Sequence, residues 1–539
     1  MKNILRYTLA ICTAGLLPVA CTSNFDEYNT NQNQMEMGDV HPLNLLEHIL
    51  FTGADGMVYR TWLLNNELIQ YTVQMYTENV HRYMIRDSYN SGTWNHLARW
   101  AANSDLIIEQ AVKNGDANSE AIALTMRALF VSNWTDIYGD IPFIDHQLDL
   151  DDYSDYPRIP REQVTARLLQ DLDDDLLDYL PVQWNPGTYG TTRIGRVAAY
   201  ALKARIALNW GLWEEAARCS KIATTLAEGV YDLEPLDCTY YATHADGEPS
   251  AANLFGFAGQ TSREWLWAIQ YNRLINYTSA TYYEAPRIHG GCSWLSGKLD
   301  CAILALVKES EAFIEVPLFD EPMMLAIYED HPWANRDPRL DLFCLRPDTR
   351  LWGVQYDTDV RVEKVKDYNQ STAGKEVLIS NADAVGNKSE YAANGSKGPG
   401  GYLWRKYSDK GMMGLVNGTK TEDDINAGII RFAELLLIEA EANIEWDGGD
   451  LAIAEANINR VRARVNMPPV TDRSREGLRK ALRYERKAEL CNEGFRWFDI
   501  RRWKIASKAV NGPMYAPGYS TVQNPGNYIS NVKPSFDGW

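Results

Sequence analysis

The sequence predicts a mainly α fold, in which a tetratricopeptide-like helical-repeat scaffold carries a large loop-rich, aromatic-rich insertion. Three observations indicate this. Apolar residues recur at helical spacing through residues 41–230, and a second helical hairpin pattern returns at residues 431–465. Between about 235 and 428, Gly, Pro, Asn, Asp and aromatic residues dominate and long helical periods are few. Loops that interrupt a helical scaffold commonly carry binding surfaces.

The N-terminal part predicts three separate helices. They are expected at Trp94–Val112, Glu120–Gly139 and Glu162–Leu180. A glycine ends the second helix with a proline shortly beyond it, and Pro181 stops the third, as helix termini favour.

Two helical hairpins follow, one on each side of the insertion. Arg196–Gly229 contains a turn at Trp210-Gly211 and is about 34 residues long, which is the length of a tetratricopeptide unit. Arg431–Val465 has the same Ala-rich texture, with Asp447–Asp450 as its turn. Strict repeat consensus is absent, so the scaffold is described as repeat-like.

The segment Leu478–Trp503 predicts one amphipathic helix followed by an aromatic cluster. Its apolar side chains recur at three- and four-residue steps, with acidic and basic stripes beside them. Gly494 then breaks the pattern. A helix with this much charge and aromatic surface is expected to dock on other helices through packing and ion pairs.

The insertion offers fewer regular elements. Trp265, Trp267 and Ile269 alternate within Thr261–Asn272, which predicts a strand. Cys301–Phe313 is one candidate helix, and residues 366–401 are expected to form a loop.

The N-terminus reads as an export signal and is excluded from the fold. Lys2 and Arg6 precede an apolar run of about 13 residues, too short for a bilayer span of roughly 20. Ala20 and Cys21 follow, which predicts a lipoprotein signal with Cys21 as the lipidated residue. The alternative is an ordinary secretory signal with a chance cysteine. The polar, Asn/Gln-rich residues after Cys21 suit a flexible tether.

Composition narrows the possible ligands. The 539-residue chain has a net charge of −19, which argues against nucleic acid as a partner. It contains 17 Trp and 30 Tyr. Most of these rings are expected in the core, but an excess is also what a sugar-binding surface would show, because sugar C–H faces stack on flat rings.

No catalytic or metal-binding motif is evident. The chain lacks HExxH, GxSxG, a Gly-rich phosphate loop and any CxxC pair, so we expect no enzyme activity, no cofactor and no metal site. Beyond Cys12 and Cys21, six cysteines remain; Cys292/Cys301 and Cys219/Cys238 are closest in sequence, and spacing does not establish a bond.

Several motifs together resemble those of the SusD/RagB family of surface nutrient-binding lipoproteins. They occur in the family's order: RALFVSNWTDIYGDIPF at 127–143, DPRL at 337–340, YLWRKY at 402–407, RFAELLLIEAEAN at 431–443, INRVRARVNMP at 458–468 and the segment 478–503. The family's shared motifs are mainly structural. We therefore interpret seven residues as scaffold ion pairs: Glu439, Arg462, Glu485, Arg486, Glu489, Arg496 and Asp499.

The resemblance implies a non-catalytic, SusD-like lipoprotein on the outer membrane. It would be anchored by lipid on Cys21 and would deliver oligosaccharides to a SusC-like TonB-dependent transporter. Family ligand loops correspond to residues 81–94 and 276–294. The expected stacking rings are Tyr83, Tyr89, Trp94, Tyr282, Tyr283 and Trp294; the expected polar ligand contacts are Arg82, Asn90 and Arg287.

The expected organisation follows from these assignments. It comprises a signal peptide at 1–20, a tether at 21–40, an N-terminal helical part at 41–234, the insertion at 235–428, a C-terminal helical part at 429–505 and a tail at 506–539.

Three other functions remain open from the sequence. The same architecture could capture peptides, the protein could be a glycosidase with an unrecognised carboxylate pair, or the scaffold could bind only protein.

Overall fold

The structure is a computed structural model of the 539-residue chain. It describes most of residues 87–146, 156–238, 252–291 and 337–509, with gaps at 275–276, 347–348, 358–361, 385–402, 414–415 and 418–419. Outside these ranges it describes residues 41, 42 and 44 and the short strands 72–74, 295–297, 306–309, 312–315, 514–517 and 526–530. No helix in these ranges is long and apolar enough to cross a membrane.

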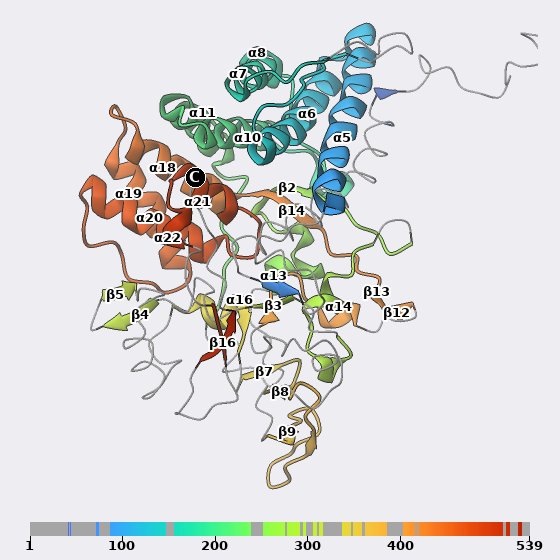
Figure 1. The fold of residues 1–539 in the computed structure, drawn as a ribbon, viewed down its shortest axis with the longest axis vertical. Coiled ribbons are helices and arrows are strands. Elements are labelled where there is room, and N and C mark those ends of the chain that lie inside the picture. Colours follow the sequence, from blue (N-terminus) through green and yellow to red (C-terminus); the bar gives the residue numbers. More distant parts are fainter. Residues whose placement is uncertain are drawn as a thin grey trace, which may run out of the picture.

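The described helices form a layered scaffold that covers the upper and left parts of Figure 1. The first hairpin consists of α5 (Asp87–Asn114) and α6 (Ala117–Tyr138), which pack along each other. Asp116 caps α6 by accepting the Ser119 N–H at 3.1 Å, and α6 ends at Gly139, as expected. Both predicted helices are confirmed, although α5 begins earlier than expected.

The third predicted helix is wrong in one respect, because it breaks in two. α7 (Arg161–Asp171) ends at Leu172, and α8 (Asp174–Leu177) starts after Asp173. The Asp173 carboxylate accepts the Asp175 N–H at 3.0 Å, so this aspartate caps a new helix instead of continuing the old one. The Asp-rich sequence at 171–175 therefore favours the end of one helix and the start of another.

Both later hairpins are confirmed. α10 (Arg196–Asn209) turns at Trp210-Gly211 into α11 (Trp213–Ala227). α18 (Phe432–Glu445) and α19 (Leu451–Arg464) form the other, and α18 also packs against α11. Residues far apart in sequence therefore share one large hydrophobic core.

The C-terminal segment divides as its glycine predicted. α20 (Arg475–Glu489) packs on α18 and α19, and α21 (Arg496–Arg502) and α22 (Ala506–Ala509) follow Gly494, whose φ is +82°. β15 (Met514–Pro517) and β16 (Gly526–Ser530) pair with each other near the C-terminus.

An antiparallel pair joins the insertion to the scaffold. β2 (Trp265–Ile269) confirms the predicted strand and pairs with β14 (Ala427–Arg431). Every residue of β2 is buried, so the alternation of large residues does not mark one solvent face. Gly428 allows this close approach, because a Cβ there would lie 1.8 Å from the Trp265 ring.

The insertion contains short elements and a second, smaller core in the lower part of Figure 1. This core contains Ala285, Trp352, Tyr356 and Leu403. The short helices are α9 (Pro186–Tyr189), which precedes the insertion, and α13 (Ala252–Phe255), η4 (Phe257–Thr261), α14 (Ala280–Glu284), η5 (Arg287–His289), α16 (Arg339–Phe343) and η7 (Lys410–Met412).

The remaining strands form two-stranded pairs. They are β1 (Thr72–Gln74) with β3 (Leu295–Gly297), β4 (Leu306–Glu309) with β5 (Ala312–Glu315), β6 (Cys344–Leu345) with β11 (Leu403–Trp404), β7 (Thr349–Leu351) with β8 (Val354–Tyr356), β9 (Lys364–Lys366) with β10 (Leu378–Ser380), and β12 (Val416–Asn417) with β13 (Lys420–Thr421). The candidate helix Cys301–Phe313 is wrong, because β4 and β5 form a hairpin there.

Candidate ligand-binding surface

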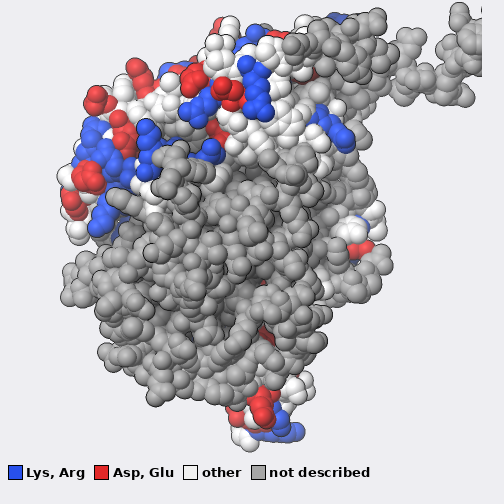
Figure 2. Space-filling model, in the orientation of Figure 1, with Lys and Arg blue, Asp and Glu red and all other residues white. Residues whose placement is uncertain are grey.

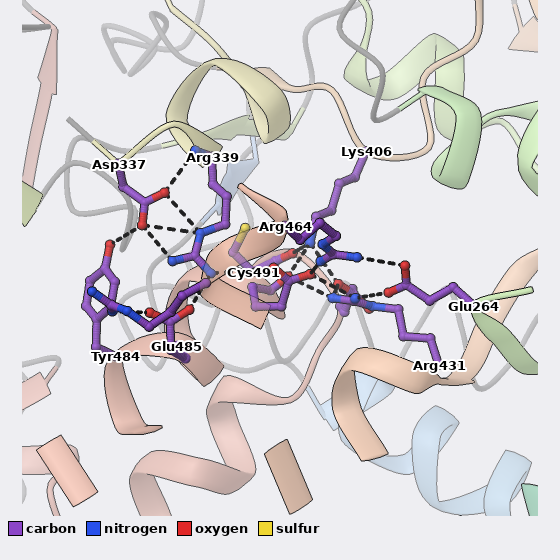
Figure 3. A network of polar contacts seen from close by, with 12 residues as sticks. Glu264, Asp337, Arg339, Lys406, Arg431, Arg464, Tyr484, Glu485 and Cys491 are labelled. Atoms are coloured by element: carbon purple, nitrogen blue, oxygen red, sulfur yellow. Dashed lines mark hydrogen bonds and ion pairs between the residues drawn. The ribbon is translucent and has the colours of Figure 1, made fainter. Parts of the chain in front are cut away.

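A buried charge network fixes the insertion on the helical scaffold (Figure 3). It joins five acids to five bases; the acids are Glu264, Asp337, Glu485, Glu489 and Glu493, and the bases are Arg339, Lys406, Arg431, Arg462 and Arg464. In Figure 3, Glu485 of α20 faces Arg339 of the insertion, and Glu264 faces Arg431 and Arg464. The charges balance, so each is compensated although nearly all of these side chains are buried.

Glu489 lies at the centre of this network. Its carboxylate contacts Arg431 at 2.8 Å and Arg339 at 3.4 Å, and it also pairs with Arg464. Burial alone would raise the pKa of Glu489, but the surrounding bases outweigh burial and hold that pKa well below its usual value. The network also includes Lys406, whose Nζ lies 2.7 Å from Glu493 and donates to two carbonyls of the 489–491 turn.

The structure confirms most of the expected scaffold ion pairs. Arg462 contacts Glu485 at 2.6 Å, Arg486 contacts Asp499 at 3.0 Å, and Glu489 lies in the network. The other two expected members, Arg496 and Glu439, form no ion pair within the residues that the structure describes. Arg496 packs over the Trp503 ring at 5.5 Å, and Glu439 accepts hydrogen bonds from the neutral side chains of Thr224 and Asn457.

Other acids of α18 do form ion pairs, among them Glu441, which the sequence analysis did not single out. Arg502 Nη2 lies 2.6 Å from its carboxylate, and Trp503 Nε1 also donates to it at 2.6 Å. Sequence spacing does not show whether Glu439 or Glu441 forms the ion pair, because the packing of α21 places Arg502 beside Glu441.

Trp94 packs into the core. Its ring meets Trp134 edge-on at 4.8 Å and Tyr138 at 5.0 Å, and the Arg158 guanidinium lies 5.2 Å from its centroid. These contacts hold the Trp94 ring, which is partly buried, against the core from within α5.

The loop carrying Tyr282 and Arg287 is held by buried acids. Tyr282 is half-buried on α14, and the backbone N–H groups of Arg287 and Ile288 donate to Asp383 at 2.7 and 3.1 Å. Burial raises the pKa of Glu284, the last residue of α14, well above its usual value, even though the Asn492 side chain and the Trp404 backbone hydrogen-bond to it. The loop therefore has a fixed shape.

Three exposed apolar side chains lie on neighbouring loops of this region. Phe257, Leu274 and Tyr277 expose 49%, 86% and 44% of their surface. The loops share one frame: Asp409 accepts the Phe257 N–H at 2.8 Å, and Asp423 pairs with the backbone of Thr278 and accepts the Thr281 N–H at 2.7 Å.

Asp424 completes this frame. It accepts the Arg273 N–H, and the Gln260 amide donates to its carbonyl. Phe257, Leu274, Tyr277 and these polar groups are here called the ring surface. The sequence analysis placed Tyr277 within the 276–294 ligand loop but did not select it, and it did not consider Phe257, because exposure of one ring among many is not visible in sequence.

Other expected site residues lie outside the described part of the chain. These are Cys21, Arg82, Tyr83 and Trp294, and for Tyr89, Asn90 and Tyr283 the backbone is described but the side chain is not.

Among the residues that the structure describes, four cysteines are free thiols: Cys219, Cys238, Cys344 and Cys491. The Cys219/Cys238 pair is thus not bonded. Burial raises the pKa of the Cys219 thiol to about 12, which keeps it protonated and unreactive. Within the described ranges, no group of three or more His, Cys, Asp or Glu side chains is placed to hold a metal ion.

Comparison with known proteins identifies the class. Residues 328–536 match the model of the SusD family, and residues 32–186 match a related model described as starch-binding associating with outer membrane. A SusD-like protein P2 from Formosa agariphila is 25% identical over 461 residues, covering 80% of this chain and 77% of that protein. Residues 32–186 and 328–536, which make up most of the chain, are thus similar to the SusD/RagB family.

Solved structures show the same fold. A SusD-like carbohydrate binding protein from Bacteroides fragilis superposes with a TM-score of 0.69 at 19% identity, covering 88% of this chain and 89% of that one. A laminarin binding SusD-like protein gives a TM-score of 0.54 at 17% identity, covering 87% and 92%. The mainly α fold is therefore confirmed.

One segment matches an unrelated family. Residues 293–354 match the LysR substrate binding domain. The chain is also 86% identical over 108 residues to the DNA-binding transcriptional dual regulator OxyR of Escherichia coli, a match that covers 17% of this chain. The chain spans about a third (35%) of the length of this curated relative. Trp294 and the β4–β5 hairpin fall within the segment 293–354, which is here called the regulator-like segment.

Proposed function

We propose that this protein is a non-catalytic, cell-surface lipoprotein that captures oligosaccharides and delivers them to a SusC-like TonB-dependent transporter. The observation that carries the proposal is the ring surface. Its exposed rings are Phe257 and Tyr277, and the partly exposed polar groups near them are the Asp409 and Asp424 carboxylates and the Gln260 amide. Such rings can stack on sugar faces and such polar groups can hydrogen-bond hydroxyls.

The comparisons support the same proposal. One similar structure is described as a carbohydrate binding protein and another as laminarin binding, and a matching family is described as associating with the outer membrane. We propose Cys21 as the lipid attachment point. In the proposed site, Tyr282 on α14 and Arg287 on η5 follow Tyr277 along the chain. The other proposed ligand contacts are Tyr83, Tyr89, Trp94, Tyr283, Trp294, Arg82 and Asn90.

The test is a glycan-array screen of the protein, followed by titration calorimetry with the best polysaccharide. Tyr277→Ala should weaken binding about five-fold, because one stacking contact is worth on the order of 1 kcal/mol. The matched control is Tyr179→Ala. Tyr179 is also exposed, at 64%, but it lies on the helical scaffold after α8, so this variant should bind as wild type does.

Three other outcomes would change the proposed site, ligand or activity. Equal binding by wild type and Tyr277→Ala would remove the ring surface from the site. A silent array combined with binding to a peptide library would favour peptide capture on the same architecture. Release of reducing ends from a bound polysaccharide would contradict the non-catalytic assignment.

A further inference from the structure

A cavity of about 400 Å³ lies in the helical scaffold, between α11, α18 and α19. Phe432, Leu436 and Ile453 supply apolar lining, and Thr224, Asn457 and Glu439 supply polar groups. In Figure 1 these helices lie at the upper left, whereas α14, which follows Tyr277, lies at the lower right. The cavity is therefore separate from the ring surface, and its volume is within the range of small-molecule sites.

Glu439 is an unusual member of this lining. It is 3% exposed, yet its carboxylate accepts hydrogen bonds only from Thr224 Oγ1 at 3.2 Å and Asn457 Nδ2 at 2.8 Å. Both donors are neutral, and within the described part of the chain no base forms an ion pair with it. A buried carboxylate normally has a positive partner, because losing water costs several kcal/mol that neutral donors only partly restore.

The bases around the cavity are engaged elsewhere or lie in solvent. Arg460 pairs with Asp232 at 2.6 Å, and Arg263 donates to the carbonyls of Gly229 and Val230 at 3.0 Å each. Lys221 lines the cavity from an exposed position on α11. Figure 2 shows charges of both signs mixed over this part of the surface.

We propose that this cavity binds a small organic cation, an ammonium or guanidinium group on a frame the size of a sugar or an amino acid, with Glu439 as its counter-charge. Other buried acids of α18 are neutralised by arginines of the scaffold: Arg502 pairs with Glu441, and Arg205 pairs with Glu434. The bound cation would fill the same role beside Glu439. Thr224 and Asn457 orient the carboxylate, and the apolar lining contacts the carbon frame. The net charge of −19 favours approach of a cation.

The test compares three probes by titration calorimetry at about pH 6. Glucosamine and n-butylguanidinium carry the charge, and N-acetylglucosamine keeps the sugar frame without it. Both cations should bind in roughly the millimolar range, and N-acetylglucosamine should bind at least about ten-fold more weakly. Glu439→Gln, which is nearly the same shape and keeps an acceptor, should lose about ten-fold for both cations.

Three control variants make the result specific. Glu476→Gln removes an acid on α20 that is largely exposed, and Tyr277→Ala alters the ring surface; both should bind the cations as wild type does. Lys221→Gln should also bind unchanged. Retained glycan binding in Glu439→Gln would show that this site and the ring surface are independent.

Four results would each overturn the proposal, and the first three concern the binding of the probes. These are equal binding of glucosamine and N-acetylglucosamine, cation binding that survives Glu439→Gln, or no cation binding at all. A Lys221→Gln variant that binds glucosamine about ten-fold more tightly would likewise overturn it, because Lys221 would then be the counter-charge in the free protein. Thermal unfolding of each variant confirms that loss of binding is not loss of fold.

Discussion

At the residue scale, the partners of each acid decide its role. Glu439 and Glu441 are two positions apart on one helix, yet Glu441 meets Arg502 and Glu439 meets only neutral donors. Asp105 is a third case. It is 1% exposed and contacts Arg127 at 2.7 Å, but Arg127 also serves Asp171 at 2.6 Å.

Asp105 predicts a pH-dependent stability. Burial raises its pKa to about 6, against the opposing effect of Arg127. When the pKa of a carboxyl is higher in the folded state than in the unfolded state, its protonated form stabilises the fold. This stabilisation is fully present below the unfolded-state pKa and is lost as the pH rises through about 6. Relative to Asp105→Asn, the wild type should therefore lose on the order of 3 kcal/mol of unfolding free energy between pH 4 and pH 7.

Urea unfolding of both proteins across this pH range measures that difference. Asp447→Asn is the control, because Asp447 is exposed in the α18–α19 turn and should change the profile little. A constant gap between wild type and Asp105→Asn would contradict the prediction.

At the element scale, the buried charge network connects pieces that are short by themselves. α16 has five residues and β14 has five, too few for independent stability. Both carry an arginine, Arg339 and Arg431, that reaches Glu489 at the end of α20. The elements of the insertion are thus fixed by α20 more than by their own hydrogen bonds.

Removing Glu489 should therefore destabilise several elements at once. Glu489→Gln leaves Arg339, Arg431 and Arg464 short of one negative charge inside the protein. Breaking a buried pair in this way costs about 3–5 kcal/mol. Guanidinium unfolding should show that loss, whereas Glu476→Gln should cost less than about 1 kcal/mol because Glu476 is 82% exposed. Equal stability of the two variants would mean that the network contributes little.

At the scale of the whole molecule, different parts of the chain match two different families. The SusD-family matches cover residues 32–186 and 328–536, and the regulator-like segment begins at 293. Within the described residues, β4 and β5 of that segment pair only with each other. Asp337, by contrast, belongs to the family's DPRL motif and lies in the buried charge network.

We expect the fold to tolerate loss of most of the regulator-like segment. Residues 298–336 would be replaced by a Gly/Ser linker of about 12 residues, which spans on the order of 20 Å. The variant keeps β3 and Asp337, so it should unfold within a few degrees of the wild type and keep the same helix content by circular dichroism. A drop of more than about 10 °C would show that the segment is part of the family core.

The sequence by itself determined most of the long helices, the two helical hairpins, the β2 strand and the resemblance to the family, but it was wrong for the helix predicted at Cys301–Phe313. These depend on short-range periodicity, on residues such as Gly139 and Gly494 that end helices, and on motifs kept in order. At Asp173 the sequence contains both a continuing helical pattern and a residue that can cap a new helix. The pattern predicts one helix, whereas in the structure the cap begins a second one.

Only the tertiary structure decided which side chains are buried, paired or exposed. Trp94 and Tyr277 both lie in expected ligand loops, but Trp94 packs on Trp134 and Tyr138 whereas Tyr277 is exposed. Glu439 and Glu441 differ for the same reason. Each outcome depends on contacts between separate segments, such as Trp94 with Trp134 or Glu441 with Arg502, and periodicity within one segment carries no information about them.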